Sequence, residues 1–428
     1  MSDDNSRNGV ISRRRALKLM GRTAASAAIL APTVAAAQDP LQNLIRSNRQ
    51  AEWTDSFDAT LPEVRAVNSL APTLTPEALG RMQLATARYG ALQTRGGWPF
   101  VRPTKRTALR LGSRDKVVTV LRERLTSAGD LRQVGGRGDV YDSYVAAAVK
   151  RFQLRHGLQA HGILDQPTID AMNVPVGVRL RQLEMNMGRI AEQSRQLADR
   201  YVLVNIPAAE IEAVASGRVR SRHTGVVGKV DRPSPILTSK VHEINFNPYW
   251  TVPVSIIRKD LIPRMKEDPS YLANNRIRIY RWGNTEREFH YTEIDWNTDE
   301  ATKYMFRQDP GELNSLGTVK INFHNTHQVY LHDTPDKSLF GDGDRFHSSG
   351  CVRVQNVREL ITWLLRSNGW DRAQVDSTIR SGQRLDVKIK QPTQIMFAYI
   401  TAWVNADGVV HFRDDIYGHD GMGALAQR

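Results

Sequence analysis

One cysteine and one histidine in the C-terminal third of the sequence form a candidate nucleophile and base. Cys351 is the only cysteine among 428 residues, and His332 ends an alternating apolar run, where a strand would pass into a turn. A cysteine nucleophile needs a base that accepts its proton and a backbone that presents the sulfur to the substrate. Gly350, directly before Cys351, meets the second need, and His332 meets the first. The pair predicts thiol-based nucleophilic catalysis.

Strand alternation predicts which side chains accompany this pair. Residues two apart on a strand share a face, so Tyr330 should point into the same cleft as His332, and Arg353 should share a face with Cys351. We expect the amides of Gly350 and Cys351, with the Tyr330 hydroxyl, to stabilise an oxyanion. Arg353 would lower the pKa of the thiol and bind a substrate carboxylate.

Strand alternation does not settle the roles of three further residues near the predicted cleft. Ser349 stands next to the nucleophilic segment, in Ser348-Ser349-Gly350-Cys351. Trp250 follows a predicted strand and is equally consistent with lining the cleft and with core packing. The group that orients His332 is either Asp333 or a backbone carbonyl, because the Asp333 side chain points to the opposite face if the strand persists.

The sequence favours no metal or cofactor. His324 and His327 precede His332, but on a strand the first two face opposite ways, and no Glu stands at a helical spacing. Gly341-Asp-Gly-Asp344 is typical of a flexible turn and lacks the remaining ligands of a calcium loop.

The N-terminal 37 residues have the pattern of an export signal. Basic residues precede a short alanine-rich run from Thr23 to Val34 and three alanines that end at Ala37. This order is typical of a signal peptide, and the adjacent Arg13 and Arg14 resemble a twin-arginine signal. The run is too short and too poor in Leu and Ile to span a membrane well, although an uncleaved anchor is the alternative. The mature protein is expected in the periplasm, without a stable membrane span.

Export also bears on the single cysteine. An exported protein with one cysteine cannot form an internal disulfide, so no disulfide framework stabilises the fold. A buried, inert cysteine is the ordinary alternative. The neighbouring glycine, the histidine and the export signal together favour a nucleophile.

Length and charge limit the class of protein. A chain of 428 residues predicts two or three domains, and 40% apolar and 24% charged residues are typical of a folded protein. The formal charge is +14, of which +4 lies in residues 1–37. The excess suits an anionic polymer or a membrane surface. Because the chain has no arginine-rich tail, zinc-finger spacing or RNA-type aromatic motif, nucleic acid is not an expected partner.

Before residue 200, helical periodicity dominates. Residues 38–105 should form a mainly helical scaffold segment, with helical spacing at Leu61–Val67 and Pro76–Tyr89. Residues 106–175 should form a compact three-helix unit, and residues 176–200 an amphipathic linker helix. The apolar positions that define the unit's first two helices are Val118, Leu121, Leu125, Val145, Val149 and Phe152.

After residue 200, short strands dominate and predict a mainly β, sandwich-like catalytic domain over 201–410. The whole chain is thus expected to be multidomain α+β. Two helices interrupt the strands, at Val254–Lys266 and Val357–Ser367. The long polar stretch 267–315 predicts a lid or insertion, and 411–428 a solvated tail. The expected strands are 201–206, 241–246, 319–323, 328–332, 351–354, 385–389 and 395–404.

The three-helix unit resembles the peptidoglycan-binding domain type 1. The resemblance is carried by Leu109-Arg-Leu-Gly, Leu121-Arg-Glu-Arg-Leu125, Ala148-Val-Lys-Arg-Phe-Gln153, His156-Gly157, Gly162 and Thr168. Its usual Asp-Gly is His161-Gly162 here. The resemblance implies glycan strands as a partner, and a plain spacer domain is the alternative.

The strand-rich region resembles the L,D-transpeptidase catalytic domain (YkuD family), in its large, periplasmic YcbB-like branch. The matching residues are Phe246-Asn-Pro-Tyr-Trp250, Tyr330-Leu-His-Asp-Thr-Pro335, Ser338-Leu-Phe340, Ser348, Gly350-Cys-Val-Arg353 and Thr401-Ala-Trp403. The family often has Ser-His-Gly-Cys where this chain has Ser349 before Gly350. This departure favours His332 as the base.

The resemblance implies a peptidoglycan transpeptidase. Cys351 would form a thioester with a tetrapeptide donor stem and pass it to the side-chain amine of a second stem, which gives a 3-3 cross-link. The family is also inactivated by carbapenems, which acylate the cysteine. The alternatives are an L,D-carboxypeptidase, which gives the same thioester to water, and a non-catalytic wall-binding protein. Stem peptides, glycan strands and cell-wall synthases are the implied partners, and the oligomeric state is open.

Overall fold

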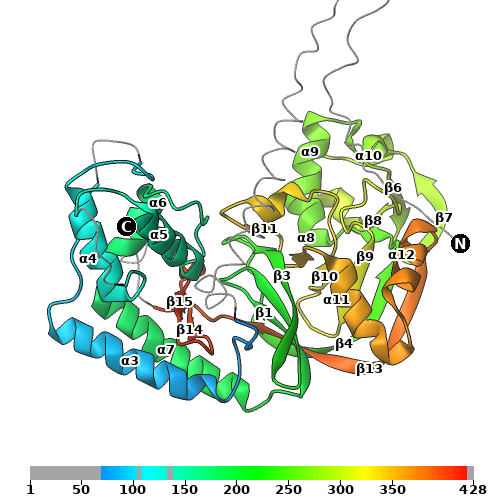
Figure 1. The fold of residues 1–428 in the computed structure, drawn as a ribbon. Coiled ribbons are helices and arrows are strands. Elements are labelled where there is room, and N and C mark those ends of the chain that lie inside the picture. Colours follow the sequence, from blue (N-terminus) through cyan, green and yellow to red (C-terminus); the bar gives the residue numbers. More distant parts are fainter. Residues whose placement is uncertain (1–68, 104–107, 133–137, 422–428) are drawn as a thin grey trace, which may run out of the picture. The chain divides into compact units, whose positions relative to one another are not determined.

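The computed structural model describes residues 69–103, 108–132 and 138–421 (Figure 1). The predicted signal peptide, residues 1–37, therefore lies outside the described residues. So do the expected helix Leu61–Val67 and the last residues of the tail, 422–428. Among the described residues, no helix is both long and apolar enough to cross a membrane.

The predicted three-helix unit forms where the apolar spacing placed it. Its helices are α4 (Val117–Ala128), α5 (Ser143–Arg155) and α6 (Gln166–Asn173). Asp142 and Asp165 cap α5 and α6, because their carboxylates accept hydrogen bonds from free amides of the first turn. The six predicted apolar positions are all fully buried in one cluster: Val118, Leu121, Leu125, Val145, Val149 and Phe152.

Helices α3 (Ala78–Thr94) and α7 (Val176–Ser194) pack together and cover one side of the strand-rich region. Leu183 and Ile190 of α7 share a buried cluster with Met82 of α3 and with Leu203 of β1 (Arg200–Asn205). The predicted linker helix is thus a packing element as well as a connection.

Nine strands of the described residues form one sheet, which confirms the strand-rich architecture. The order is β11-β3-β12-β10-β9-β4-β13-β1-β2, and β2 also pairs with β3, so the sheet closes on itself. Besides β1, its strands are β2 (Glu210–Ala215), β3 (Arg218–Gly228), β4 (Leu237–Phe246), β9 (Val319–Phe323), β10 (Leu331–His332), β11 (Phe346–Ser348), β12 (Val352–Val354) and β13 (Leu385–Ala398).

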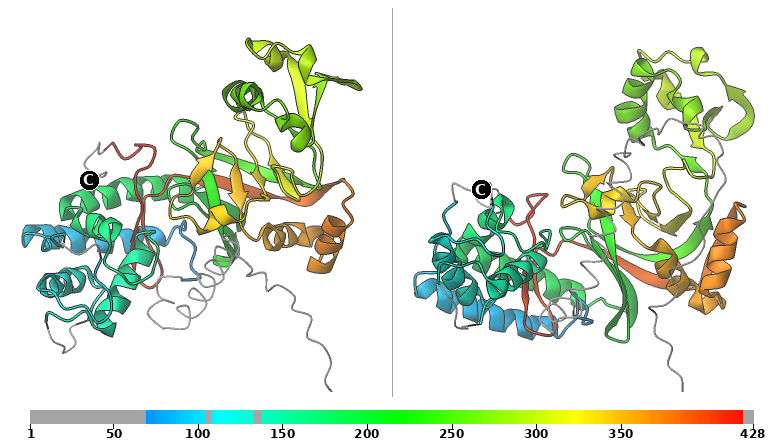
Figure 2. Two further views of the ribbon diagram at one scale, coloured as in Figure 1. Left: turned by 90° about the horizontal axis from the view of Figure 1, so that it is seen from above. Right: turned by 45° about the horizontal axis from the view of Figure 1, so that its top comes forward.

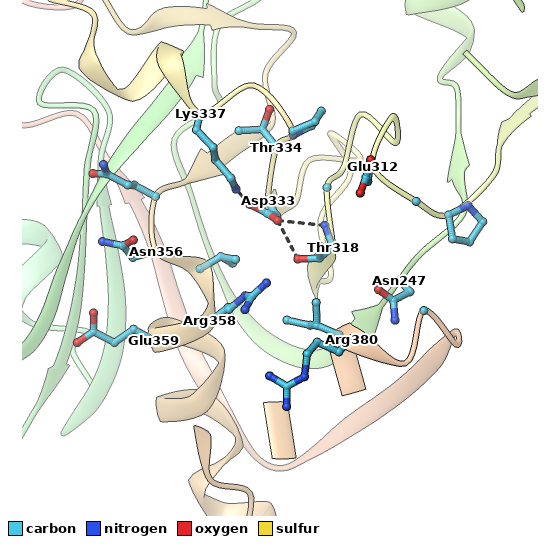
Figure 3. A pocket seen from close by; sticks show the side chains of 18 of the residues that line it. Asn247, Glu312, Thr318, Asp333, Thr334, Lys337, Asn356, Arg358, Glu359 and Arg380 are labelled. Atoms are coloured by element: carbon cyan, nitrogen blue, oxygen red, sulfur yellow. Dashed lines mark hydrogen bonds and ion pairs between the residues drawn. The ribbon is translucent and has the colours of Figure 1, made fainter. Parts of the chain in front are cut away.

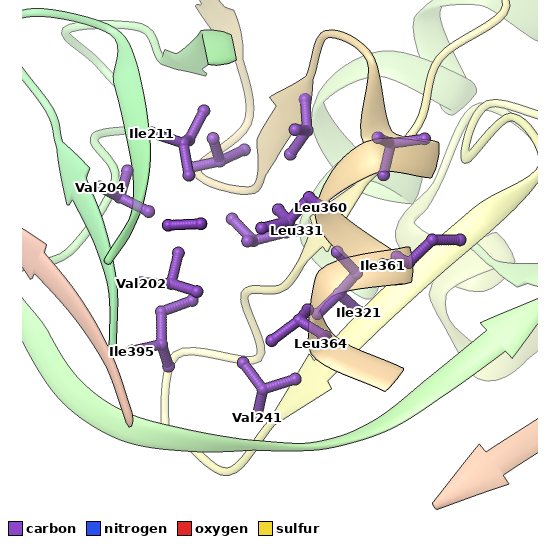
Figure 4. Close-up of a cluster of buried hydrophobic side chains, with 14 of the residues drawn as sticks. Val202, Val204, Ile211, Val241, Ile321, Leu331, Leu360, Ile361, Leu364 and Ile395 are labelled. Carbon is purple, nitrogen blue, oxygen red and sulfur yellow. The ribbon is translucent and has the colours of Figure 1, made fainter. Parts of the chain in front are cut away.

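Alternation along the strands separates the core from the outer face. Leu331 of β10 and Ile321 of β9 point inward and pack against Leu360 and Leu364 of α11 (Val357–Leu364) (Figure 4). The next helix, α12 (Arg372–Arg380), lies beside α11 (Figure 2). Because successive side chains alternate, His332 is directed away from this core.

Two strand predictions were wrong in extent. The stretches expected as separate strands at 385–389 and 395–404 are mostly one long strand, β13, with a register shift between Lys388 and Thr393. Pro392 lies in this shift and has no N–H to continue the ladder. The end of the second stretch is a separate strand, β14 (Ala402–Val404), paired with β15 (Val410–Phe412).

The stretch 267–315, which was predicted as a polar lid or insertion, contains helices and strands of its own. It folds with a core of its own, which begins earlier, at Val252 (Figure 2). Charged residues alternate along the chain with buried apolar residues such as Ile277 and Ile279. The overall composition of the stretch is therefore polar, although it contains strands. The insertion consists of β5 (Trp250–Thr251), α8 (Val254–Ile256), a π-helical segment (Ile257–Leu261), α9 (Ile262–Glu267), α10 (Tyr271–Asn274), β6 (Ile277–Arg281), β7 (Asn284–Phe289) and β8 (Tyr304–Gln308).

The C-terminal tail was expected to be solvated, but its described part is anchored by hydrogen bonds, although Asp414 and His419 are exposed. Asp420 is buried and accepts hydrogen bonds from Arg189 at 2.6 Å and from Thr401 at 2.7 Å. Asp415 accepts a hydrogen bond from the Tyr399 hydroxyl at 2.7 Å. These acidic residues tie the tail to α7 and to the end of β13.

Candidate active site

Three neighbouring strands place the predicted catalytic side chains on one face of the sheet. β10 pairs in parallel with β12 and antiparallel with β9, so that Lys320, His332 and Arg353 are register partners in one row. Tyr330 and Cys351 precede His332 and Arg353 by two residues and therefore share this face. The structure thus brings together four predicted site residues and one that was not predicted, Lys320.

The Cys351 thiol is half-buried and within hydrogen-bonding reach of Tyr330, through both the backbone N–H and the hydroxyl. Burial raises the pKa of Cys351 to about 11, although the hydrogen bonds from Tyr330 and the positive charges of Lys320 and Arg353 act to lower it. Arg353 therefore acts in the predicted direction, but burial outweighs it. At neutral pH the thiol is protonated and needs a base.

The orientation of His332 comes from a backbone carbonyl. Its Nδ1 lies 2.5 Å from the carbonyl oxygen of Asp333. Since a carbonyl only accepts, Nδ1 carries the proton, and Nε2 is left as the basic nitrogen. Burial, with the positive charge of Arg353, lowers the pKa of His332 to about 3. The imidazole is therefore neutral at neutral pH and able to accept a proton.

The Asp333 carboxylate is held away from His332. It forms an ion pair with Lys337 and accepts hydrogen bonds from the Thr318 amide at 3.1 Å and hydroxyl at 2.8 Å. Gly317 permits this packing, because a Cβ there would lie 2.7 Å from the Asp333 carboxylate. Of the two candidates for the orienting group, the carbonyl of Asp333 makes the contact and its side chain does not.

A cavity of about 1070 Å³ borders Asp333, but neither Cys351 nor His332 lines it (Figure 3). The side chains of Asp333, Lys337 and Thr318 meet at its wall, as Figure 3 shows, while Arg358 and Arg380 lie across from them.

The loop before the nucleophile is fixed by its own hydrogen bonds. The Ser348 hydroxyl donates to the carbonyl of Cys351 at 2.5 Å and accepts from the Gly350 amide at 3.1 Å. Gly350 has φ +108°, a conformation that side chains disfavour. Because the Gly350 amide is engaged, it does not fit the predicted role of oxyanion donor. The Cys351 amide and the Tyr330 hydroxyl are the remaining candidates.

The C-terminal tail supports this loop through Tyr417. Its hydroxyl donates to the carbonyl of Gly228 and accepts from the Ser234 amide at 3.2 Å. The Ser234 hydroxyl in turn donates to the carbonyl of Gly350 at 2.9 Å. The tail thus contributes to the position of the nucleophilic loop, which its acidic composition did not indicate.

Trp250 reaches the site from the insertion. Its indole is within hydrogen-bonding reach of the Tyr330 hydroxyl, and the side chain is half-buried. Trp250 also lines a second cavity, of about 330 Å³, together with Asp260 of the π-helical segment. Trp250 thus contacts Tyr330 of the site and also packs against the core of the insertion, so both interpretations of its role stay open.

Arg232 links the insertion to the nucleophilic loop. Its guanidinium forms a bidentate ion pair with Asp260 and donates a hydrogen bond to the hydroxyl of Ser349 at 3.0 Å. Ser349, predicted beside the nucleophile, is thus a point of attachment for Arg232. π-Helical segments such as the one that holds Asp260 are frequent at functional sites.

Replacing Arg232 with methionine should loosen this link and expose the thiol. We expect iodoacetamide to alkylate Cys351 about 5-fold faster, since a partly exposed ion pair is worth roughly 1 kcal/mol. The modification can be followed by intact-mass spectrometry, because Cys351 is the only cysteine. Arg264→Met, which removes an exposed arginine of the same insertion, is the matched control. Equal rates in the two variants would contradict the link.

Lys320 is the site residue that the sequence analysis missed. Its ammonium lies 4.4 Å from the centre of the Tyr330 ring, and its register partner is His332. The sequence did contain one pattern that points to Lys320. Apolar and polar residues alternate over Val319–Phe323, which places the Lys320 side chain on the face opposite the core. The pairing of this strand with β10 was needed to connect it with the site.

The histidines considered as metal ligands have another arrangement. His324 stacks on His242, with ring centres 4.0 Å apart. Within the described part of the chain, no group of three or more His, Cys, Asp or Glu side chains has a geometry that could hold a metal ion.

Comparison with known proteins finds a family model that matches each of the two regions. Residues 199–405 match the model of the L,D-transpeptidase catalytic domain (YkuD), and residues 114–172 match the "Putative peptidoglycan binding domain". A curated relative, "Putative L,D-transpeptidase" of Haemophilus influenzae, is 32% identical over 250 residues, which cover 58% of this chain and 50% of the relative. The chain thus spans about half the length of that relative.

Solved structures with detectable similarity also include L,D-transpeptidases. The protein of Stackebrandtia nassauensis is 14% identical, with a TM-score of 0.25, over 69% of this chain and 97% of that chain. The protein of Xylanimonas cellulosilytica is 15% identical, with a TM-score of 0.22, over 69% of this chain and 100% of that chain.

Proposed function

We propose that this chain, which carries the catalytic domain of the L,D-transpeptidase family, forms 3-3 cross-links between peptidoglycan stem peptides through a cysteine thioester. The observation that carries the proposal is the shared face of Cys351, Tyr330 and His332, with a protonated thiol and a neutral imidazole. A neutral pair of this kind suits a reaction in which the proton leaves the thiol as the sulfur attacks.

The first half of the reaction makes the thioester. Nε2 of His332 accepts the proton of Cys351 while the sulfur bonds to the carbonyl carbon of the donor stem. The Cys351 amide and the Tyr330 hydroxyl donate to the oxyanion, and one such donor is worth roughly 3 kcal/mol. The carbon–nitrogen bond then breaks, and His332 returns the proton to the leaving amine of the terminal D-alanine.

The second half reverses these steps with a new amine. The side-chain amine of the acceptor stem attacks the thioester carbon and passes a proton to His332. The carbon–sulfur bond breaks, and the thiolate of Cys351 takes the proton back from His332. The direct product is an amide between two diaminopimelate residues, and Cys351 is ready for another donor.

The remaining parts of the chain fit a protein that works on the cell wall. We infer that residues 114–172 hold glycan strands, that residues 1–37 direct export by the twin-arginine route, and that the mature protein acts in the periplasm beside cell-wall synthases. His161, which replaces the usual Asp, contacts Asp165 at 3.1 Å and the Ile163 amide at 3.1 Å. These contacts help to hold the loop before α6.

Incubation of the mature protein with purified disaccharide-tetrapeptide, followed by mass spectrometry, tests the proposal. A cross-linked dimer with loss of D-alanine is the expected product. Tripeptide alone would make the protein an L,D-carboxypeptidase and overturn the cross-linking function. No reaction, together with no acylation of Cys351 by a carbapenem, would favour a non-catalytic wall-binding protein.

A further inference from the structure

Two cations flank the proposed base. Lys320 and Arg353 are the register neighbours of His332 on either side, and both are half-buried. Among the residues that the structure describes, neither forms an ion pair with a carboxylate, although Glu243 and Asp386 act on the charge of Lys320, and Asp336 on that of Arg353, from a longer distance. The Nε of Arg353 is buried without a hydrogen-bond partner there, and the Lys320 ammonium lies over the Tyr330 ring instead.

Other buried cations among the described residues have polar partners within the chain, although not always acidic ones: Arg124 donates to the carbonyl of Met172 and Arg413 to that of Arg155. Arg155 is paired with Asp130 at 2.6 Å, and Arg222 with Glu212 at 2.7 Å. A buried charge without a partner is costly, because it loses water and gains no compensating contact. Two such charges beside one catalytic group indicate that an anion from outside the chain completes the site.

The position of the cations limits where that anion sits. Neighbouring strands are about 4.8 Å apart, so Lys320 and Arg353 reach a group close to the His332 imidazole. In the proposed reaction His332 exchanges a proton with an amine nitrogen. A carboxylate on the carbon that bears this amine is only two bonds from the nitrogen, within reach of both side chains.

We propose that Lys320 and Arg353 form a carboxylate clamp, which binds the carboxylate of an α-amino acid whose amine reacts at His332. The proposal rests on the proposed function and specifies its substrate class. The leaving D-alanine and the D-centre of the acceptor diaminopimelate both carry an amine and a carboxylate on one carbon. One clamp therefore serves the departure of the first amine and the entry of the second.

A different role for the two cations is stabilisation of the sulfur anion. Both charges act to lower the pKa of Cys351, as noted above, and burial lowers the pKa of Lys320. That role would affect every substrate equally, whether or not it has a carboxylate. The two roles therefore differ in how activity depends on the substrate's carboxylate.

The test compares donors and acceptors with and without that carboxylate. Release of the terminal residue is measured for a tetrapeptide donor that ends in D-alanine and for one that ends in D-alanine amide. Exchange is measured with D-alanine and with D-alanine amide as the acceptor. We expect the wild type to prefer the free carboxylate by about 10- to 100-fold in kcat/KM, the range of a charge-assisted hydrogen bond.

Neutral variants should remove the preference without removing the chemistry. Lys320→Met and Arg353→Met should each lower kcat/KM for the free carboxylate by about 10-fold more than for the amide substrates, and Lys320→Arg should retain the preference. Lys388→Met, on an exposed lysine of β13, is the matched control. Carbapenem acylation and thermal unfolding report on folding and on the thiol.

The outcomes distinguish a failure of the carboxylate-clamp proposal from a failure of the proposed function on which it rests. Preference for the carboxylate in the donor assay alone places the clamp on the leaving residue, and preference in the acceptor assay alone places it on the incoming one. Equal losses for acid and amide substrates would overturn the clamp in favour of sulfur stabilisation. A wild type that turns over neither donor would contradict the proposed function itself.

Discussion

Replacing Cys351 with alanine should abolish both turnover of tetrapeptide donors and acylation by a carbapenem. The chain offers no second thiol, since Cys351 is its only cysteine. Loss of a covalent nucleophile removes the thioester route completely, so that the expected reduction exceeds about 1,000-fold. Acylation is read as a mass increase of the intact protein, and turnover as released D-alanine. Residual turnover near the wild-type rate would contradict the mechanism.

Cys351→Ser is the informative companion variant. Serine keeps the size and polarity of the side chain, but its hydroxyl is far less acidic than a thiol, and the neutral imidazole of His332 has a pKa of only about 3. We expect the serine variant to bind donors normally and to turn over about 1,000-fold more slowly. Both variants should unfold within a few degrees of the wild type, because the thiol packs at the edge of the core and makes no ion pair.

The sequence was sufficient for those parts of the site that depend on local alternation. The spacing of Tyr330 and His332 placed these two on one face of their strand, and the spacing of Cys351 and Arg353 did the same for the next strand, without knowledge of the strand order. That the two pairs share one face of the sheet follows from the pairing of β10 with β12. Lys320 has the same alternation, but its relevance depends on β9 pairing with β10. That pairing joins residues twelve apart in the chain, and the local alternation of apolar and polar residues does not predict it.

The orientation of His332 shows a second limit. β10 ends at His332. Strand alternation therefore no longer predicts the side-chain direction of Asp333, the residue that supplies the orienting group. The turn that follows sends the Asp333 carboxylate to Lys337 and leaves its carbonyl beside Nδ1. A sequence pattern names Asp333 as a candidate but does not distinguish its carbonyl from its side chain.

The predictions that differ most from the structure were those based on amino-acid composition alone. The stretch 267–315 was predicted as a polar lid or insertion, with no strands assigned to it, because charged residues dominate it, yet Ile277, Ile279 and Phe306 are buried in a core of its own. The described tail was expected to be solvated because of its aspartates, yet Asp420 is buried through hydrogen bonds to Arg189 and Thr401. Charge is a poor guide where each acid has a specific partner, since pairing compensates for lost hydration.

The largest change in pH dependence should follow from replacing His332 with glutamine. Glutamine keeps a polar side chain that can donate to the Asp333 carbonyl, but it cannot accept the thiol proton. At pH 7 we expect carbapenem acylation to slow by about 1,000- to 10,000-fold, the upper range for loss of a general base. The variant must then rely on the small fraction of thiolate that the pKa of Cys351, about 11, allows.

The signs of the two pKa shifts distinguish the wild type from this variant. In the wild type the imidazole is unprotonated above its pKa of about 3, and the thiol keeps its proton below its pKa of about 11. Acylation should therefore be nearly flat between about pH 5 and pH 9. In His332→Gln the rate should rise about tenfold per pH unit across the same window, because only the ionised fraction reacts. Stopped-flow acylation measures both profiles. A wild-type limb near pH 6 to 7 would mean instead that the resting pair is a thiolate and an imidazolium, in which case burial does not set the charge state of the site.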